Sequence, residues 1–441
     1  MQYEKKIQEI FERHPSVQVN GFSGRAYKAG IEGMTAFDAA LGHPWKAFRC
    51  IHVAGTNGKG SVSSMLAASL ASTGLRVGLY TSPHLLDFRE RIKIIGGAPC
   101  PQRTCHPRRV RGGTVNEVNG GVERSETSRG VGGSPILISK QEVLEFLDKY
   151  EKEIEGLSFF EITTGMALSW FKKEAVDVAV IEVGLGGRLD STNVITPELS
   201  VVTSIGLDHC SMLGDTRAEI ALEKAGIFKK GVPAVVWGHD PETDEVFADY
   251  AKRVGAELHF ADEMIEPVHI DGMDLRGEYQ DSNVRTTLAA LQLLGMEPDL
   301  EAIRNTARIT GLRGRWEILR ENPTVICDIG HNPPALAQNF RQLEESGREL
   351  IIVYGVMADK ALDDIAPLMP ARARYILCAP DSARALPVAE LYARLGTLRP
   401  DLNLQTAPSV RDALDHALSL ASPDTLIYVG GSTFVVAEII K

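Results

Sequence analysis

The sequence lacks an apolar run long enough to cross a membrane, and it lacks an excess of basic residues. Its 441 residues carry 47 Lys and Arg against 58 Asp and Glu, a formal net charge of −11. A membrane-spanning helix needs about 20 consecutive apolar residues, and general nucleic-acid binders present a basic surface. We therefore expect neither a membrane nor a nucleic acid as a partner.

The sequence also has few cysteines, and their spacing is not that of a disulfide framework. The six cysteines are scattered along the chain, at Cys50, Cys100, Cys105, Cys210, Cys327 and Cys378. Four of them lie in or beside apolar runs. This usage is typical of buried free thiols in a reducing compartment. The first residues, MQYEKKIQEIFERH, are charged and helix-like rather than apolar like a signal peptide. The expected location is the cytoplasm.

The chain does contain a regular alternation of predicted strands and helices. Its length favours two domains, because one hydrophobic core rarely serves more than about 300 residues. Buried strands are predicted at RCIHVAG, LRVGLYTS, VDVAVIEVG and LSVVTSIG, and helices at SVSSMLAASLAST and FFEITTGMALSWFKKE. The pattern predicts an α/β fold, a mostly parallel sheet with helices on both faces.

The strand pattern restarts after GLRGRWEIL. Four short strands are predicted there, at TVICDIG, ELIIVYG, ARYILCAP and TLIYVGG. We place a domain boundary near residues 311–315, which gives a first domain at 1–310 and a smaller Rossmann-like α/β domain at 315–441.

Residues 98–135 fit neither domain. They are rich in Gly, Pro, Ser and Arg and nearly free of large apolar residues, so they are predicted to form a disordered surface insertion. Cys100, Cys105 and His106 suggest a metal site as the alternative. The spacing is not typical of zinc, however, and no second pair follows.

The stretch HVAGTNGKGSVSSML resembles a phosphate-binding loop with one unusual glycine. The common pattern places a hydroxyl residue directly after the lysine, but here Gly60 separates Lys59 from Ser61. Glycines let the backbone approach an anion, and a helix N-terminus would face the phosphates. We expect nucleotide binding here, with Ser61 reaching magnesium if Gly60 widens the turn. The alternative is a glycine-rich turn with an accidental lysine.

Three further segments carry polar residues where apolar ones are expected. Glu182 lies inside a buried-type strand, Asp208 and His209 follow another strand, and Lys224 lies on an apolar helix. A lone histidine or lysine is usually a satisfied core residue or a surface group. Because ligands bind at the carboxyl edge of open α/β sheets, the set together predicts a functional site.

The motifs together resemble the folylpolyglutamate synthase/dihydrofolate synthase family of the Mur ligase superfamily. They occur in family order over nearly the whole chain apart from the insertion: HVAGTNGKGS, TSPHL, FRERI, FFEITT, EVGLGGRLDSTNV, GLDH, LGDT, EKAGIFK, GRWE and DIGHNP. In this family the loop reads TNGKGS, so the extra glycine is a family feature.

The resemblance implies site residues one by one. ATP contacts are expected from Asn57, Gly58, Lys59, Gly60, Ser61, Asn283, Arg315, Asp328 and His331, with Asn332 in the same motif. One magnesium ion would be held by Ser61, Ser82 and Glu182, and a second by His209 and Lys224, the latter as a carbamate. Lys59, Lys224 and His209 are the expected catalytic residues. Phe160, Glu161 and Asp190 are expected beside the pterin substrate, with helix, core or capping roles as the alternative.

The implied activity is ATP-dependent addition of L-glutamate to dihydropteroate, to reduced folates, or to both, through an acyl phosphate. The resemblance implies ATP and two magnesium ions, allows a monovalent cation, and favours a monomer with a Mur-ligase-type ATP-binding domain and a glutamate-ligase domain. A cell-wall ligase is the first alternative, although only about 50 residues precede the loop. A non-catalytic ATP-binding protein is the second, although the implied metal ligands are all present.

Three positions depart from the family pattern. DIGHNP stands where the family has DGAHNP, which places Ile329 and Gly330 beside Asp328. Ala361 stands where an acid usually follows Asp359 and Lys360, so no role is assigned to that pair. The insertion is the third departure, and its closure entropy costs little because that cost grows only logarithmically with length.

Overall fold

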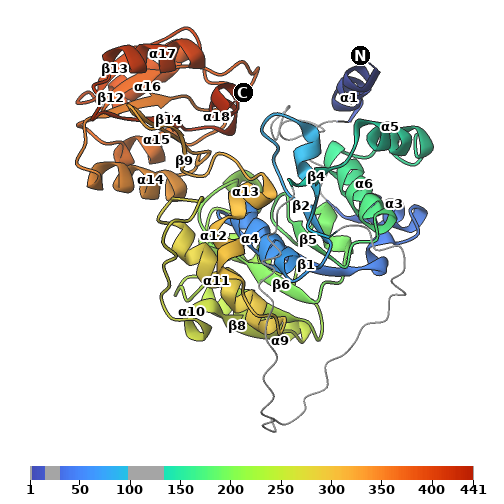
Figure 1. Cartoon of the computed structure of the whole chain (residues 1–441). Coiled ribbons are helices and arrows are strands. Elements are labelled where there is room, and N and C mark those ends of the chain that lie inside the picture. The colour runs from blue at the N-terminus through green and yellow to red at the C-terminus, as the bar shows by residue number, and fades with distance from the viewer. Residues whose placement is uncertain (1, 15–29, 98–133, 441) are drawn as a thin grey trace, which may run out of the picture.

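The computed structural model describes residues 2–14, 30–97 and 134–440. Residues 98–133, with most of the predicted insertion and its Cys100, Cys105 and His106, lie outside the described residues. Two sheets organise the described chain, and the second lies beside one end of the first domain (Figure 1). None of the described helices is long and apolar enough to span a membrane.

The first sheet has eight strands in the order β4-β3-β2-β5-β1-β6-β7-β8. The strands are β1 Arg49–Ala54, β2 Val77–Tyr80, β3 Ile92–Ile95, β4 Ile136–Leu137, β5 Val178–Glu182, β6 Leu199–Val202, β7 Pro233–Val236 and β8 Glu257–Phe260. All pairings are parallel except β2–β3 and β3–β4. β1 therefore lies between β5 and β6, with Val53 beside Glu182 and Ala54 beside Val202.

Helices cover both faces of this sheet, as predicted. They are α1 Gln2–Arg13, α3 Glu32–Ala40, α4 Lys59–Ser72, α5 Lys140–Lys149, α6 Phe159–Lys173, α7 Cys210–Leu213, α8 Arg217–Ala225, α9 Asp244–Val254, α10 Ala261–Met264, α11 Gln280–Leu293, α12 Leu300–Arg304 and α13 Thr306–Thr310. Successive strand residues point to opposite faces. One core therefore forms under α4, α11, α12 and α13, and others form under α3 and α6 and under α8 and α9.

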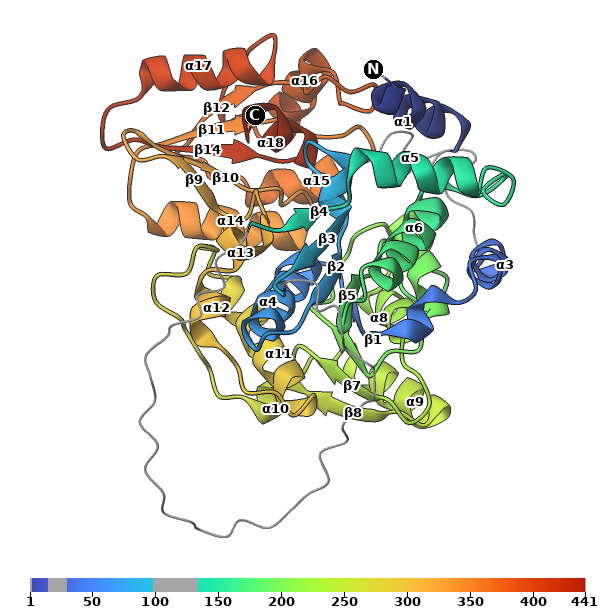
Figure 2. The same cartoon turned by 45° about the vertical axis from the view of Figure 1, so that its right-hand side comes forward.

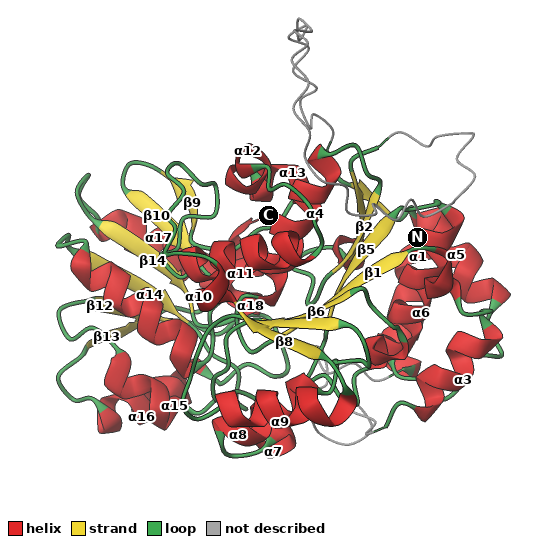
Figure 3. Cartoon of the chain, turned by 90° about the horizontal axis from the view of Figure 1, so that it is seen from below, coloured by secondary structure: helices red, strands yellow, loops and turns green. Residues whose placement is uncertain are grey.

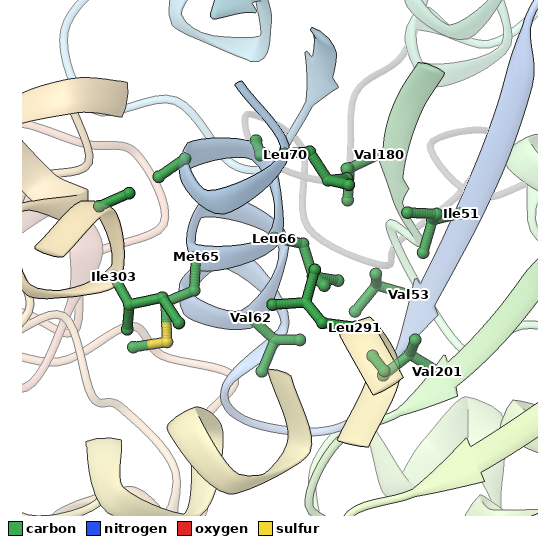
Figure 4. Close-up of a cluster of buried hydrophobic side chains, with 14 of the residues drawn as sticks. Ile51, Val53, Val62, Met65, Leu66, Leu70, Val180, Val201, Leu291 and Ile303 are labelled. Atoms are coloured by element: carbon green, nitrogen blue, oxygen red, sulfur yellow. The ribbon is translucent and has the colours of Figure 1, made fainter. Parts of the chain in front are cut away.

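The core under α4 positions the start of that helix. Figure 4 shows four apolar side chains of α4 packed between the strands and the covering helices. The residues are Val62, Met65, Leu66 and Leu70 on α4, Ile51, Val53, Val180 and Val201 on the strands, and Leu291 and Ile303 on α11 and α12. Because these side chains are fully buried, the first turn of α4 is fixed at the carboxyl edge of β1.

The second sheet has six strands in the order β13-β12-β11-β14-β10-β9. The strands are β9 Glu317–Arg320, β10 Thr324–Cys327, β11 Leu350–Tyr354, β12 Arg374–Leu377, β13 Asn403–Thr406 and β14 Leu426–Gly430; the helices are α14 Pro333–Glu345, α15 Leu362–Ile365, α16 Val388–Leu398, α17 Val410–Leu420 and α18 Thr433–Ile440. Figures 2 and 3 show this sheet and its helices as a layer separate from the first sheet.

The prediction of four strands after residue 315 was incomplete. β9 and β13 are additional strands at the two edges of the sheet. Their residues are mostly half-exposed or exposed, in contrast to the fully buried β11 and β14, so neither forms an apolar run. The two sheets fall on either side of residues 311–315, and the exact domain boundary stays a prediction.

Candidate active site

The loop between β1 and α4 is shaped by glycines in close contact with neighbouring elements. Gly55 and Gly58 have φ angles of +149° and +89°. A Cβ atom at Gly55 would lie 1.7 Å from Thr203 Oγ1, and one at Gly58 would lie 2.2 Å from Asn283 Oδ1. Both the backbone conformation and the close approach therefore require glycine.

Contact of Ser61 with magnesium through a turn widened at Gly60 stays a prediction. α4 already begins at Lys59, so Gly60 lies in its first helical turn. A Cβ atom at position 60 would lie 3.4 Å from Arg315 Nη2 and 3.6 Å from Glu182 Oε2. The missing side chain keeps the space open in front of the Glu182 carboxylate.

Residues after β6 hold this loop, and the sequence reasoning missed them. Thr203 Oγ1 donates to the Asn57 carbonyl at 2.6 Å, and Ser204 Oγ donates to the same oxygen at 3.2 Å. Lys59 Nζ donates to the carbonyls of Gly55 and Thr56 at 3.0 and 3.1 Å. The sequence did contain a signal for them, because Thr203 and Ser204 are two hydroxyl residues at the carboxyl end of a predicted strand.

α11 brings the predicted nucleotide contact Asn283 to the start of α4. Gln280 Nε2 donates to Ser61 Oγ at 3.3 Å, and Asn283 Nδ2 donates to Gln280 Oε1 at 2.8 Å. Gln280 was not predicted as a site residue. It connects the predicted phosphate contact Ser61 to Asn283, so both lie at one edge of the sheet.

Glu182 is buried at the end of β5 beside this loop. Burial raises the pKa of its carboxyl group, and the nearby Lys59 ammonium acts in the opposite direction. Among the described residues, the hydrogen bond recorded to this carboxylate comes from Ser82 N at 3.2 Å. The predicted ligands Ser82 and Glu182 therefore lie next to each other. The Glu182 carboxylate oxygens can still accept further hydrogen bonds or bind a cation.

Lys224 and His209 share the surroundings of Lys59. Burial, followed by the Lys59 charge, lowers the pKa of Lys224 to about 7. Burial lowers the pKa of His209 to about 3, and the positive charges of Lys360 and Lys59 act in the same direction against the raising effect of Asp208. A substantial part of the Lys224 amine is therefore uncharged near neutral pH, and His209 is a neutral imidazole that can act as a ligand.

Asp328, at the end of β10, is also buried, but its carboxylate is fully used. It accepts hydrogen bonds from Tyr279 Oη at 2.6 Å, Trp316 N at 2.9 Å, Gly330 N at 2.7 Å and Asn339 Nδ2 at 2.9 Å. Tyr279 precedes α11, so this group joins the second sheet to the first domain. A nucleotide contact by Asp328 stays a prediction.

The predicted pterin-side residues have partners within the fold. Glu161 forms a capping box with Ser158 at the start of α6, and Asp190 accepts from Leu185 N at 2.8 Å and Thr192 N at 2.9 Å. A Cβ atom at Gly184 would lie 2.4 Å from the Phe160 ring. Phe160 thus packs on the loop that holds Asp190, while the capping roles account for both carboxylates. Substrate contact by the three stays a prediction.

The second domain meets the phosphate loop directly. The Asn57 and Asn332 side-chain amides hydrogen-bond to each other at 3.1 and 3.0 Å. Nearby, a cavity of about 1090 Å³ is lined by residues of both domains. His331 lies at this junction, with Nδ1 3.0 Å from the Ile329 carbonyl and Nε2 3.7 Å from Asp208 Oδ2.

The predicted ligands can be tested for their fit to magnesium. In the described part of the chain, no three His, Cys, Asp or Glu side chains are close enough to hold a metal ion. Ser61, Ser82 and Glu182 instead offer hydroxyl and carboxylate oxygens. Mg²⁺ takes oxygen ligands and usually keeps several positions for water and substrate phosphates, so this donor set fits the ion.

The chain is similar to known proteins over nearly its whole length. The family model for the Mur ligase glutamate ligase domain matches residues 314–433. The dihydrofolate synthase/folylpolyglutamate synthase of Escherichia coli is 32% identical over 429 residues, covering 93% of this chain and 90% of that protein. The chain belongs to the folylpolyglutamate synthase/dihydrofolate synthase family. The motif resemblance and the enzyme class, an ATP-dependent ligase family, are thereby confirmed.

Other family members add detail on length and fold. A probable bifunctional folylpolyglutamate synthase/dihydropteroate synthase of Haloferax volcanii is 32% identical over 440 residues, and the chain spans only 48% of that protein. The Escherichia coli FolC structure in complex with DHPP and ADP has a TM-score of 0.78 at 28% identity, covering 99% of this chain and 96% of that chain.

A bifunctional folylpolyglutamate synthase/dihydrofolate synthase structure with Mn, AMPPNP and L-glutamate bound has a TM-score of 0.77 at 27% identity, covering 99% and 97%. Together with FolC, it confirms the predicted α/β fold class.

Proposed function

We propose that this protein is an ATP-dependent ligase that joins L-glutamate to dihydropteroate, to reduced folates, or to both. The observation that carries the proposal is a group of four residues around the start of α4: Glu182 and Lys224, which are buried, and Lys59 and His209, which are partly buried. Support also comes from related structures that bind ADP with DHPP, or AMPPNP with Mn and L-glutamate.

The reaction has two steps. A carboxylate oxygen of the pterin substrate attacks the γ-phosphorus of ATP, which forms an acyl phosphate and releases ADP. The amine of L-glutamate then attacks the acyl carbon, phosphate leaves, and the amine loses a proton. The chain's contribution is to align the reactants and to neutralise charge on the phosphates.

Different residues of the chain are assigned to phosphate binding and to magnesium binding. The backbone N–H groups at the start of α4 and the Lys59 ammonium would bind the phosphates of ATP. Bound magnesium would neutralise phosphate charge, with Ser61, Ser82 and Glu182 holding one ion and His209 and carbamylated Lys224 holding another. The number of ions, an additional monovalent cation and the monomeric state stay predictions of the resemblance, and the cytoplasmic location stays a prediction from cysteine usage.

The lowered pKa of Lys224 suits the proposed carbamate. An uncharged amine attacks the carbon of CO2, forms an N–C bond and loses a proton, which yields an anionic group with oxygen ligands. Near pH 7 a large fraction of Lys224 is uncharged, because its pKa is about 7. An exposed lysine, with a pKa near 10.4, would be almost wholly protonated.

The proposal is tested by ADP release from the purified protein with ATP, Mg²⁺ and L-glutamate. Three reactions are compared: with dihydropteroate, with tetrahydrofolate, and without a pterin. Release with both pterins is expected from a bifunctional enzyme, and release with one defines the substrate. A protein that binds ATP but releases no ADP in response to either pterin would contradict the proposal.

A further inference from the structure

Asp208 joins the two domains at the edge of the phosphate loop. It lies after β6 in the first domain, and only 10% of its side chain is exposed. Its Oδ1 accepts a hydrogen bond from Lys360 Nζ at 3.0 Å, and its Oδ2 accepts one from Asn332 Nδ2 at 2.9 Å. Both donors belong to the second domain, so each carboxylate oxygen bridges the domains.

Asn332 extends this contact to the phosphate loop itself. Its amide pairs with the amide of Asn57, and its Oδ1 also accepts from Ala335 N at 3.0 Å, which caps α14. The orientation of α14 is therefore coupled to both Asn57 and Asp208. One buried carboxylate, two amides and a lysine form a continuous hydrogen-bonded group between the domains.

The backbone beside Asp208 is equally close to the second domain. A Cβ atom at Gly206 would lie 2.7 Å from Pro334 Cγ. The hydroxyl of Thr56 makes two hydrogen bonds with Gly206. Its Oγ1 accepts one from Gly206 N and donates one to the Gly206 carbonyl oxygen, each at 3.1 Å. No room remains for a side chain between this segment and the start of α14, so domain contact here depends on glycine.

We propose that Asp208 is a positioning residue that holds Lys360 and the start of α14 against the phosphate loop. This inference rests on the proposed function, because it concerns the cavity between the domains that Asp208 and Lys360 both line. Both carboxylate oxygens are already bonded to second-domain donors. Asp208 therefore acts through Lys360 and Asn332 rather than as a metal ligand.

The expected kinetic effect is selective. The phosphate loop is built from first-domain residues, whereas the cavity needs both domains in place. Asp208→Asn should therefore raise the KM for L-glutamate by about tenfold or more, since breaking a buried charge pair is costly. The KM for ATP should change much less.

A matched control is available on the same cavity. Asp359 pairs with Arg384 at 2.9 Å, and both residues belong to the second domain. Asp359→Asn removes a neighbouring ion pair without breaking a contact between domains. It should leave the domain arrangement as in the unmodified protein.

The experiment compares Asp208→Asn, Lys360→Gln, the double variant and the Asp359→Asn control. If Asp208 acts through Lys360, the double variant should show a KM for L-glutamate no worse than the worse single variant. A metal-ligand role for Asp208 predicts a different result. The KM effects of the two single variants would then multiply in the double variant, and raised Mg²⁺ would restore the activity of Asp208→Asn. That result would overturn the proposal.

Small-angle X-ray scattering supplies a readout that needs no activity. The radius of gyration should increase in Asp208→Asn and in Lys360→Gln, but not in Asp359→Asn. An unchanged radius of gyration in Asp208→Asn and Lys360→Gln would overturn the positioning proposal. Because this measurement does not depend on ligase activity, it tests the positioning role separately from the proposed function. Should Asp208→Asn not fold, Gly206→Ala provides the second test, because its Cβ should separate the same surfaces.

Discussion

Two buried carboxylates lie at strand ends, one in each sheet, and they differ in the number of hydrogen bonds that they accept. Glu182, at the end of β5, is 2% exposed and accepts one recorded hydrogen bond from the described residues. Asp328, after β10, is 3% exposed and accepts four. A buried charge needs partners. Hydrogen bonds of the fold satisfy Asp328, whereas Glu182 accepts one and otherwise has only the nearby positive charges of Lys59, Arg315 and Arg91.

Two buried lysines of the first domain show the same contrast. Lys93 on β3 donates to the Thr310 carbonyl at 2.9 Å. Lys224 on α8 is equally buried, but its amine has no recorded hydrogen bond within the described ranges. Burial alone therefore does not distinguish these two lysines. They differ in the number of hydrogen-bond partners that the described fold supplies.

Glu182→Gln should have the largest effect on activity. Loss of a ligand that positions charge on the phosphates should cost several kcal/mol, about a 1000-fold decrease in kcat. Thermal unfolding should be unchanged or shifted upward, since a buried charge is removed. Pterin-dependent ADP release and a melting curve measure the two effects, and near-normal turnover would exclude Glu182 as a metal ligand.

Lys224→Ala should reduce turnover by about 100-fold while the fold is retained. The physical reason is loss of the proposed carbamate oxygens next to His209. Added acetate or propionate should restore part of the activity, because a small carboxylate can occupy the vacated volume. Rescue is assayed by ADP release with and without the carboxylate; normal turnover without it would contradict the second-metal assignment.

Asp328→Asn should act chiefly on stability. An asparagine amide would direct its own N–H groups at some of the four donors that now face Asp328, so at least one buried donor would lose its acceptor. The expected cost is about 2 kcal/mol in the free energy of unfolding. Urea denaturation measures it, with Glu182→Gln as the matched carboxylate variant. If Glu182→Gln lost more stability than Asp328→Asn, the fold would depend more on Glu182 than on Asp328, contrary to this comparison.

Lys93 should contribute a pH dependence of stability and have no direct effect on activity. Burial lowers the pKa of Lys93 to about 8 in the folded protein, and the unfolded value is near 10.4. Between these values the unfolded chain binds more protons, so the free energy of unfolding rises with pH, by at most about 1.4 kcal/mol per pH unit. Lys93→Met should flatten this rise between pH 8 and 10. An unchanged slope would show that Lys93 is not the group responsible.

Local patterns allowed much of the fold and several site positions to be predicted. Apolar runs located β1, β5, β11 and β14, and a glycine-rich segment after a strand located the phosphate loop. Glu182 and Lys224 were identifiable because a charge interrupts an apolar pattern. The spacing of Ser158 and Glu161 is that of a capping box, a signal that the prediction for Glu161 did not use.

The remaining features depend on contacts between distant residues. Asn57 and Asn332 are 275 positions apart, and Asp208 and Lys360 are 152 apart. No local pattern encodes such a pairing. The half-exposed edge strands β9 and β13 lack an apolar run, and the four partners of Asp328 come from four separate segments.

The antiparallel pairing of β3 with β4 has a practical consequence. Ile94 lies beside Ile136 and Lys93 beside Leu137, at the edge of the first sheet. The end of β3 and the start of β4 are therefore held side by side by hydrogen bonds of the sheet itself. A fluorescent reporter with closely spaced termini, inserted between these two strands, should leave β3, β4 and the core beneath them in place.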